Sequence, residues 1–133
     1  MRKNRKKKAA KKTQISGKYG TIEAMKDRLI LVSTRAGIVL NIILWLVLVG
    51  KFGISSSRVP LHYNVVYGID FSGSSWKVYT IPFTGLSILL VNHFLAGIIG
   101  EREKVFAYLL SFAIPAVQLL LLVAGISLVA LNV

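Results

Sequence analysis

The stretch that decides the fold is "VYTIPFTGLSILLVNHFLAGIIG", Val78 to Gly100, which contains no charged side chain. A helix needs about 20 apolar residues to cross a hydrocarbon core of ~30 Å, so this block predicts a membrane-spanning helix. A second block without charge, Val105 to Val133, follows after the short segment "EREK" and predicts another.

A third apolar block precedes these two and is shorter. It runs from Ala36 to Gly50 between Arg35 and Lys51. It is long enough to span if "LILVST", residues 29–34, extends the same helix and Arg35 snorkels to the headgroups. A basic leader before a short apolar run is also typical of a signal peptide. That alternative is weaker, because the leader is long and "GKFGISSSR" is a poor cleavage site.

Composition agrees with a membrane protein. The chain has 133 residues, 54% of them hydrophobic, and a mean hydropathy of +0.64, which is too apolar for a soluble domain of this size. We therefore expect an all-α membrane protein with three transmembrane helices. The absence of cysteine excludes disulfides, thiolate catalysis and iron–sulfur ligation. No nucleophile, base and orienting group fall together, so we expect neither an enzyme nor a bound cofactor.

The basic residues predict the orientation. Twelve of the 17 Lys and Arg residues lie within residues 1–35, whereas the 51–77 connection holds only Lys51, Arg58 and Lys77. The positive-inside rule then places the N-terminus in the cytoplasm and the C-terminus outside. The expected order is a disordered polybasic cytoplasmic tail (1–20), an amphipathic segment and first spanning helix (21–50), an extracytoplasmic loop (51–77), a second spanning helix (78–100), a cytoplasmic turn (101–104) and a third spanning helix (105–133).

The tail "MRKNRKKKAAKKTQISGKYG" has almost nothing to bury, which is typical of disorder. Next to a bilayer its lysines are expected to bind anionic headgroups. The residues assigned to this role are Lys6, Lys7, Lys8, Lys11 and Lys12. Nonspecific, salt-sensitive contact with RNA is the alternative, and no specific nucleic acid is expected. A helix is predicted to begin after the tail, with Thr21 as its N-cap.

The polar residues singled out inside the predicted spans are Asn41, Asn92, His93 and Ser111. With a rise of about 1.5 Å per residue, they lie ~9 to ~14 Å from the cytoplasmic ends of their helices. Hydrogen bonds between helices are the main expectation. A proton or ligand relay through His93 is the alternative, although no carboxylate lies in any span. Gln118, one turn after Pro115, could bond the backbone group that the proline frees.

The predicted outer loop contains "VPLHYNVVYGIDFSG", residues 59–73. An extended run after Pro60 would place His62, Asn64 and Val66 on one face, before a turn at Gly68 and Asp70. This makes the loop structured and β-like, with Ser74 or Ser75 as the cap of the next helix. A metal site formed by His62, Asn64 and Asp70 is a weaker alternative, because zinc usually takes three or four good ligands.

The same residues carry a family resemblance. Pro60, His62, Asn64, Gly68 and Asp70, followed by Lys77, resemble the P-x-H-[WF]-N…G…D…K loop of a bacterial membrane domain of unknown function. Proteins with that domain include the immunity protein against a sporulation-delaying toxin, and this chain looks like small three-pass relatives of the group. The chain departs from this pattern at two points. It has Tyr63 where tryptophan is commonest, and three residues between Asn64 and Gly68 where the family usually has two.

The resemblance implies a bacterial plasma membrane protein with a folded outer loop and gives no reaction. The small three-span architecture with its basic tail and structured outer loop predicts an accessory or interaction protein, whose partners would be other membrane proteins or further copies of the chain. Toxin immunity or ligand sensing through the outer loop is the alternative.

Overall fold

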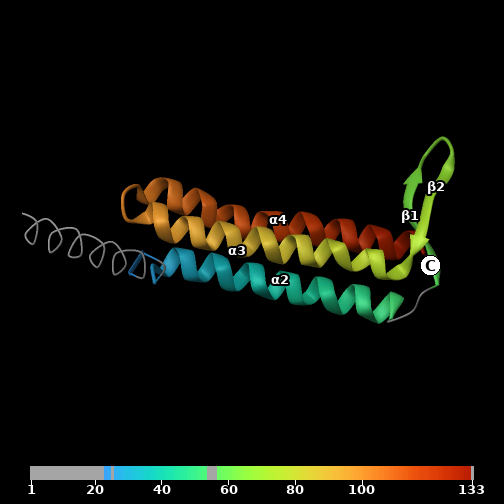
Figure 1. The fold of residues 1–133 in the computed structure, drawn as a ribbon, viewed down its shortest axis with the longest axis horizontal. Helices are drawn as coiled ribbons and strands as arrows, with labels where there is room; N and C mark the ends of the chain where they lie inside the picture. Colours follow the sequence, from blue (N-terminus) through green and yellow to red (C-terminus); the bar gives the residue numbers. More distant parts are fainter. Residues whose placement is uncertain (1–22, 25, 54–56, 133) are drawn as a thin grey trace, which may run out of the picture.

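The protein is a bundle of three long helices with a β-hairpin at one end (Figure 1). The computed structural model describes residues 23–24, 26–53 and 57–132. Its elements, in chain order, are α2 (Arg28–Phe52), β1 (Arg58–Asn64), β2 (Gly68–Ser74), the 3-10 helix η1 (Ser75–Tyr79), α3 (Thr80–Gly100) and α4 (Lys104–Leu131). Helix α2, η1 with α3, and α4 are each long and apolar enough to cross a membrane, as predicted.

The first helix includes the whole segment on either side of Arg35. It begins at Arg28, where the Asp27 carboxylate accepts a hydrogen bond of 2.9 Å from the Leu29 amide. It ends at Gly53, which has a φ of 57°. The predicted cap Thr21, the tail predicted to be disordered and the lysines predicted to bind headgroups lie outside the described residues. Because α2 has 25 residues, the short apolar block becomes long enough to span.

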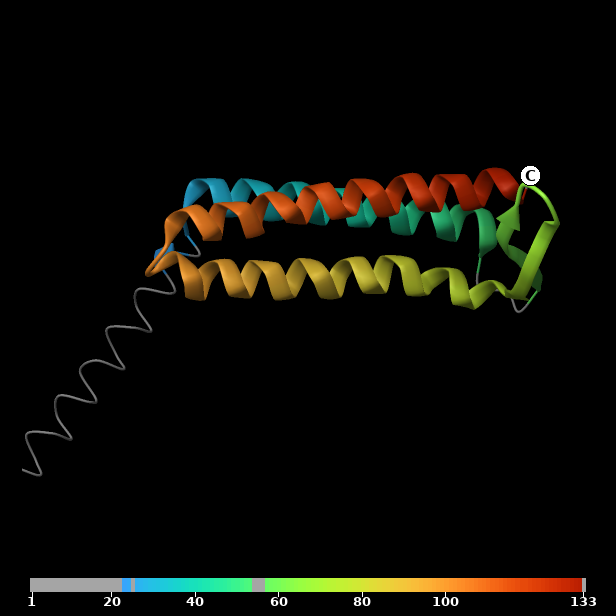
Figure 2. The ribbon, with the colours of Figure 1, turned by 90° about the horizontal axis from the view of Figure 1, so that it is seen from above.

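Helix α4 packs against both α2 and α3, and Figures 1 and 2 show the three helices running along one another. Small residues let it approach closely. A Cβ on Gly37 would lie 2.4 Å from Cγ2 of Ile114, and a Cβ on Gly125 would lie 2.5 Å from Cδ1 of Leu44. Glycine at such contacts permits close helix packing in membranes, where the hydrophobic effect does not drive association.

The surface of the bundle is apolar rather than polar. Leu46, Val105 and Leu120 are 68%, 68% and 70% exposed. Isolated exposed apolar residues are common in soluble proteins, but here they occur along all three helices. Such a surface suits a lipid environment.

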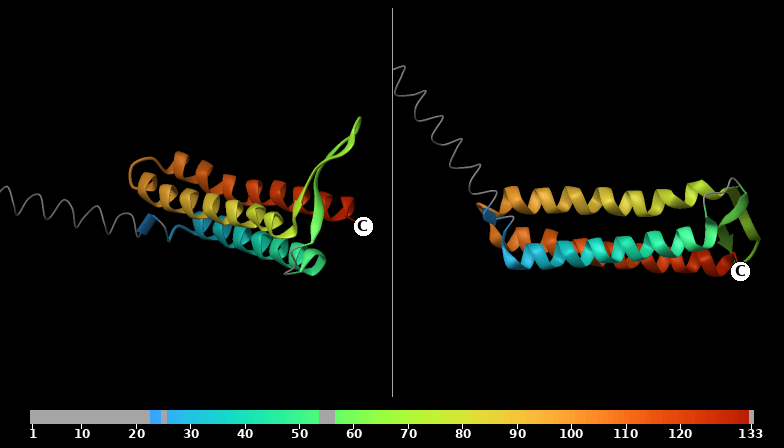
Figure 3. Two further views of the ribbon diagram at one scale, coloured as in Figure 1. Left: turned by 45° about the vertical axis from the view of Figure 1, so that its right-hand side comes forward. Right: turned by 90° about the horizontal axis from the view of Figure 1, so that it is seen from below.

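The outer connection forms an antiparallel hairpin, which agrees with the expected β-like loop. β1 and β2 pair from Arg58 with Ser74 to Asn64 with Gly68, with irregular register around His62. Figure 3 shows the hairpin standing away from the end of the bundle where α2 and α4 terminate. The base of the hairpin is joined to the end of α4, because the Asn132 side-chain amide donates a hydrogen bond of 3.0 Å to the Pro60 carbonyl.

Helix α3 follows the hairpin through η1. Ser74 is the N-cap residue of η1, but its side chain makes no capping hydrogen bond. The Thr80 hydroxyl instead donates to the Lys77 carbonyl at 2.7 Å, across the junction between η1 and α3. The Tyr79 hydroxyl donates to the Gly53 carbonyl and so joins this junction to the end of α2.

Candidate functional site

The stem of the hairpin is joined by a side-chain pair. His62 Nδ1 lies 2.6 Å from Asp70 Oδ1, and the two side chains are 64% and 38% exposed. Asp70 was expected to hold the turn. It lies within β2 instead, and its carboxylate bonds His62 on the neighbouring strand. Solvent screens such an exposed pair, so its contribution to stability is small.

The turn itself depends on Asn64 and Gly68. The Asn64 side-chain oxygen accepts a bond of 2.8 Å from the Val66 amide, and this contact ends β1 at Asn64. The extended run is therefore shorter than expected and Val66 lies in the turn. Gly68 has a φ of 74°, although a Cβ there would meet nothing within 4 Å. Glycine is thus favoured at this position by the backbone conformation and not by lack of space.

His62 and Asp70 provide two of the ligands that a zinc site would need, whereas zinc usually takes three or four. Among residues 23–24, 26–53 and 57–132, no group of three His, Cys, Asp or Glu side chains could hold a metal. Asn64 is engaged with the turn backbone. We therefore interpret these side chains as determinants of the hairpin conformation.

The tip of the hairpin is apolar and exposed. Val65, Val66 and Tyr67 are 90%, 79% and 82% exposed. Ile69 and Phe71 on β2 are also more than half exposed. Contiguous exposed apolar residues on a projecting element typically mark a contact surface. We call Val65, Val66 and Tyr67 the hairpin tip.

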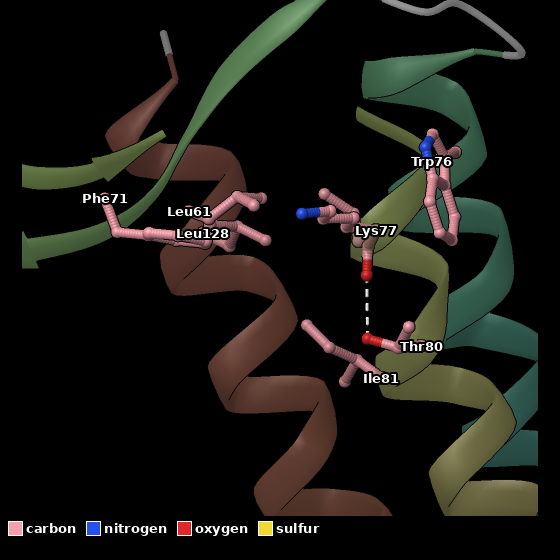
Figure 4. A pocket seen from close by; sticks show the side chains of 8 residues that line it. Leu61, Phe71, Trp76, Lys77, Thr80, Ile81 and Leu128 are labelled. Carbon is pink, nitrogen blue, oxygen red and sulfur yellow. Dashed lines mark hydrogen bonds between the residues drawn. The ribbon is translucent and has the colours of Figure 1, made fainter. Parts of the chain in front are cut away.

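A pocket lies where the hairpin stem meets the bundle (Figure 4). Its volume is about 480 Å³. It is lined by Leu61, Phe71, Trp76, Lys77, Val78, Thr80, Ile81 and Leu128. The only charge in this lining is the Lys77 ammonium, whose nitrogen lies 5.7 Å from the centre of the Phe71 ring. The pocket thus combines an apolar wall with a single cation, which we call the stem pocket.

Aromatic residues surround the same end of the bundle. Trp45 stacks on Tyr79 with ring centres 5.5 Å apart, and Phe83 meets Trp45 edge-on at 5.0 Å. Trp76 is 59% exposed beside the stem pocket. Tryptophan and tyrosine are enriched where membrane helices meet the lipid headgroups, so these residues suit a position at the membrane–water interface.

A second polar group lies in the centre of the bundle. The Asn41 side-chain amide donates to the Pro82 carbonyl and to Gln118 Oε1, both at 3.1 Å. The Gln118 amide in turn donates to the Gly85 carbonyl at 2.6 Å. Asn41 and Gln118 are 4% and 0% exposed, so these bonds are sheltered. We call Asn41, Gln118 and the two carbonyls they bind the amide cluster, and it joins all three helices.

From the sequence, the Gln118 side chain was expected to bond the backbone group that Pro115 frees. The Gln118 side chain instead reaches α3, because Gly85 has no side chain there. A Cβ on Gly85 would lie 2.8 Å from Gln118 Oε1 and 3.0 Å from Asn41 Nδ2. A glycine in the middle of the second predicted span was the feature of the sequence that could have indicated this contact.

The other predicted intramembrane residues are not joined to the amide cluster. His93 Nδ1 lies 2.9 Å from the Thr34 hydroxyl, which donates its own hydrogen to the Ile30 carbonyl at 2.8 Å. His93 therefore donates from Nδ1 to Thr34, and this bond links α3 to α2. Ser111 bonds the Ala107 carbonyl of its own helix at 2.7 Å. Within the part of the chain that the structure describes, no hydrogen bond involves the Asn92 side chain.

Comparisons with known proteins add no relative: the chain matches no family model, and searches of curated proteins and of solved structures find no match. The resemblance of the hairpin residues to the bacterial membrane domain therefore stays a prediction from sequence.

Proposed function

We propose that this chain is a small integral protein of the bacterial plasma membrane that acts as an accessory or interaction protein without enzymatic activity. The hairpin tip would be its contact surface. The observation that supports this proposal is the exposure of Val65, Val66 and Tyr67 at 90%, 79% and 82% on an element fixed at its base. Covering apolar side chains placed in this way lowers the free energy and so favours binding of a partner.

The proposed orientation places the hairpin outside the cell. It is supported by the 12 basic residues in residues 1–35, at and before the start of the first span, against three in residues 51–77. The hairpin and the end of α4 lie at the same end of the bundle, so both would face outward (Figure 1). The basic tail would bind anionic headgroups on the cytoplasmic side, with nonspecific RNA contact as a secondary property.

The expected partner is another membrane protein or a second copy of this chain. A two-stranded hairpin is only marginally stable by itself, so this one depends on its base contacts and gains order when its tip is covered. A partner anchored in the same membrane would meet the tip at high effective concentration.

Toxin immunity or ligand sensing is the second candidate, and the open sheet edges favour it. The sheet has two strands in the order β1–β2, and within the described residues no third strand pairs with either of them. An extended peptide could add to such an edge through main-chain hydrogen bonds. In that case the ligand would be a secreted peptide.

Photo-crosslinking from the hairpin tip tests the proposal. A photoreactive amino acid at Val66 is expected to give a discrete adduct with a membrane protein, or a dimer of this chain, in living cells. The matched control places the same group at Leu120, which is 70% exposed on α4 and is expected to react mainly with lipid. An adduct that needs added secreted peptide would support the second candidate, and the absence of any protein adduct at Val66 would contradict both.

Two variants of Gly68 show whether the adduct depends on the hairpin conformation. Gly68→Val places a β-branched residue at a φ of 74° and should abolish the adduct. Gly68→Asn should keep it, since asparagine tolerates a positive φ. Equal adducts in both variants would show that a folded tip is not required.

A further inference from the structure

We propose that the stem pocket binds one anionic phospholipid of the outer leaflet, with its phosphate at Lys77 and an acyl chain against Ile81 and Leu128. The inference rests on the membrane location in the proposed function, but it does not require a protein partner at the hairpin tip.

The apolar part of the site adjoins a second cavity. Ile81 and Leu128 line the stem pocket and also a neighbouring cavity of about 330 Å³, which extends along α4 to Ala124. Ala124 lies one helical turn from Leu128, which is ~6 Å toward the centre of the bundle. The two adjoining cavities, which we call the hollow, therefore extend from the end of the helices along the boundary of α3 and α4, in the direction that an acyl chain takes in a bilayer.

The charge of the site comes from Lys77. Among the described residues the one ion pair joins His62 to Asp70, so Lys77 has no carboxylate partner there. The Lys77 ammonium nitrogen lies 5.7 Å from the centre of the Phe71 ring. A Cβ at Gly73 would be too close to Leu61 Cδ1, at 2.8 Å, and would lie 3.4 Å from Lys77 Cδ, so the Lys77 stem runs along Gly73. The ammonium is thus kept beside the apolar wall and can pair with a phosphate.

The depth of Lys77 fits a headgroup. It lies in η1 between Trp76 and Tyr79, the aromatic residues that suit the membrane interface. The neighbouring Thr80 hydroxyl already donates to the Lys77 carbonyl at 2.7 Å, so it cannot donate the same hydrogen to a phosphate. Recognition of the headgroup therefore depends on charge, and the site should distinguish anionic from zwitterionic lipid.

Quenching of Trp76 by brominated lipid tests this site. The chain has two tryptophans, so Trp45→Phe leaves Trp76, at the pocket, as the only one. In phosphatidylcholine vesicles, brominated phosphatidylglycerol should half-quench Trp76 at about one fifth of the mole fraction that brominated phosphatidylcholine needs, since one lysine favours an anionic lipid about fivefold. Lys77→Gln, a change at an exposed side chain, should bring this ratio close to one.

A second pair of variants tests the apolar wall. Ile81→Phe should fill the hollow and weaken quenching by the anionic lipid, whereas Leu90→Phe, at a position that is 58% exposed on α3 and outside the pocket, should not. Equal quenching by both phospholipids, or stronger quenching by a brominated free fatty acid, would overturn the proposal. Flotation with the vesicles separates the two claims, because a chain that fails to float contradicts the proposed membrane location itself.

Discussion

Gly85→Val is expected to lower the free energy of unfolding of the bundle by about 3 kcal/mol, because it overpacks the centre and also breaks buried hydrogen bonds. Even the first added carbon would lie 2.8 Å from both Gln118 Oε1 and Leu121 Cδ1. The amide of Gln118 could then no longer reach the Gly85 carbonyl without moving α4 away from α3. Unfolding in mixed detergent micelles, followed by circular dichroism, measures the effect.

Gly50→Val is the matched control for this change. Gly50 lies in α2 and is exposed, and a Cβ there would meet nothing within 4 Å. The same substitution should change stability by less than about 1 kcal/mol, since only intrinsic helix propensity differs. Equal losses at Gly85 and Gly50 would contradict the close contact described for the amide cluster.

Gln118→Ala is expected to cost about 2 to 4 kcal/mol, because it leaves a cavity and removes a partner of Asn41. Gln118 is fully buried and is the residue through which α4 bonds both other helices. Ser111→Ala is the control on the same helix. Ser111 is also buried, but its hydroxyl bonds only within α4, so its loss should cost less than about 1 kcal/mol.

A double-mutant cycle isolates the bond between the two amides. Asn41→Ala combined with Gln118→Ala should show a coupling energy of about 0.6 to 1.7 kcal/mol, the range found for hydrogen bonds between membrane helices. Strictly additive losses would mean that Asn41 and Gln118 act separately and that the 3.1 Å contact contributes no stability of its own.

The second and third spans were predictable because bilayer thickness sets the length of apolar block that a span needs, and that length requires no knowledge of packing. The first span was predictable once Arg35 was allowed inside the helix. The rotations of the three helices were not predictable. Apolar residues occupy nearly every position of the blocks, so no helical face stands out, and depth along the axis cannot show which side chains meet. In the structure Asn41 bonds Gln118, whereas Ser111, which the sequence singled out with Asn41, bonds within its own helix. Glycines opposite polar side chains, such as Gly85, give better information on rotation than depth does.

The hairpin shows a different limit. Alternation and the glycine predicted an extended segment and a turn, and the positive φ of Gly68 fits that prediction. The position of the turn depended on which polar side chain bonds the backbone, because Asn64 and Asp70 can each do so. In the structure Asn64 closes the turn and Asp70 pairs with His62. The strand register shifts on both sides of His62, next to the His62–Asp70 pair, and no local sequence pattern predicts this shift.

The proposed topology, three membrane crossings with the hairpin outside, is tested most directly by cysteine labelling. The chain contains no cysteine, so single cysteines at Val66 in the hairpin tip and at Arg102 between α3 and α4 report without interference. With a membrane-impermeant maleimide on intact spheroplasts, Val66→Cys should be labelled at once and Arg102→Cys only after permeabilisation. Labelling of Arg102→Cys in intact spheroplasts, or protection of Val66→Cys, would contradict the account.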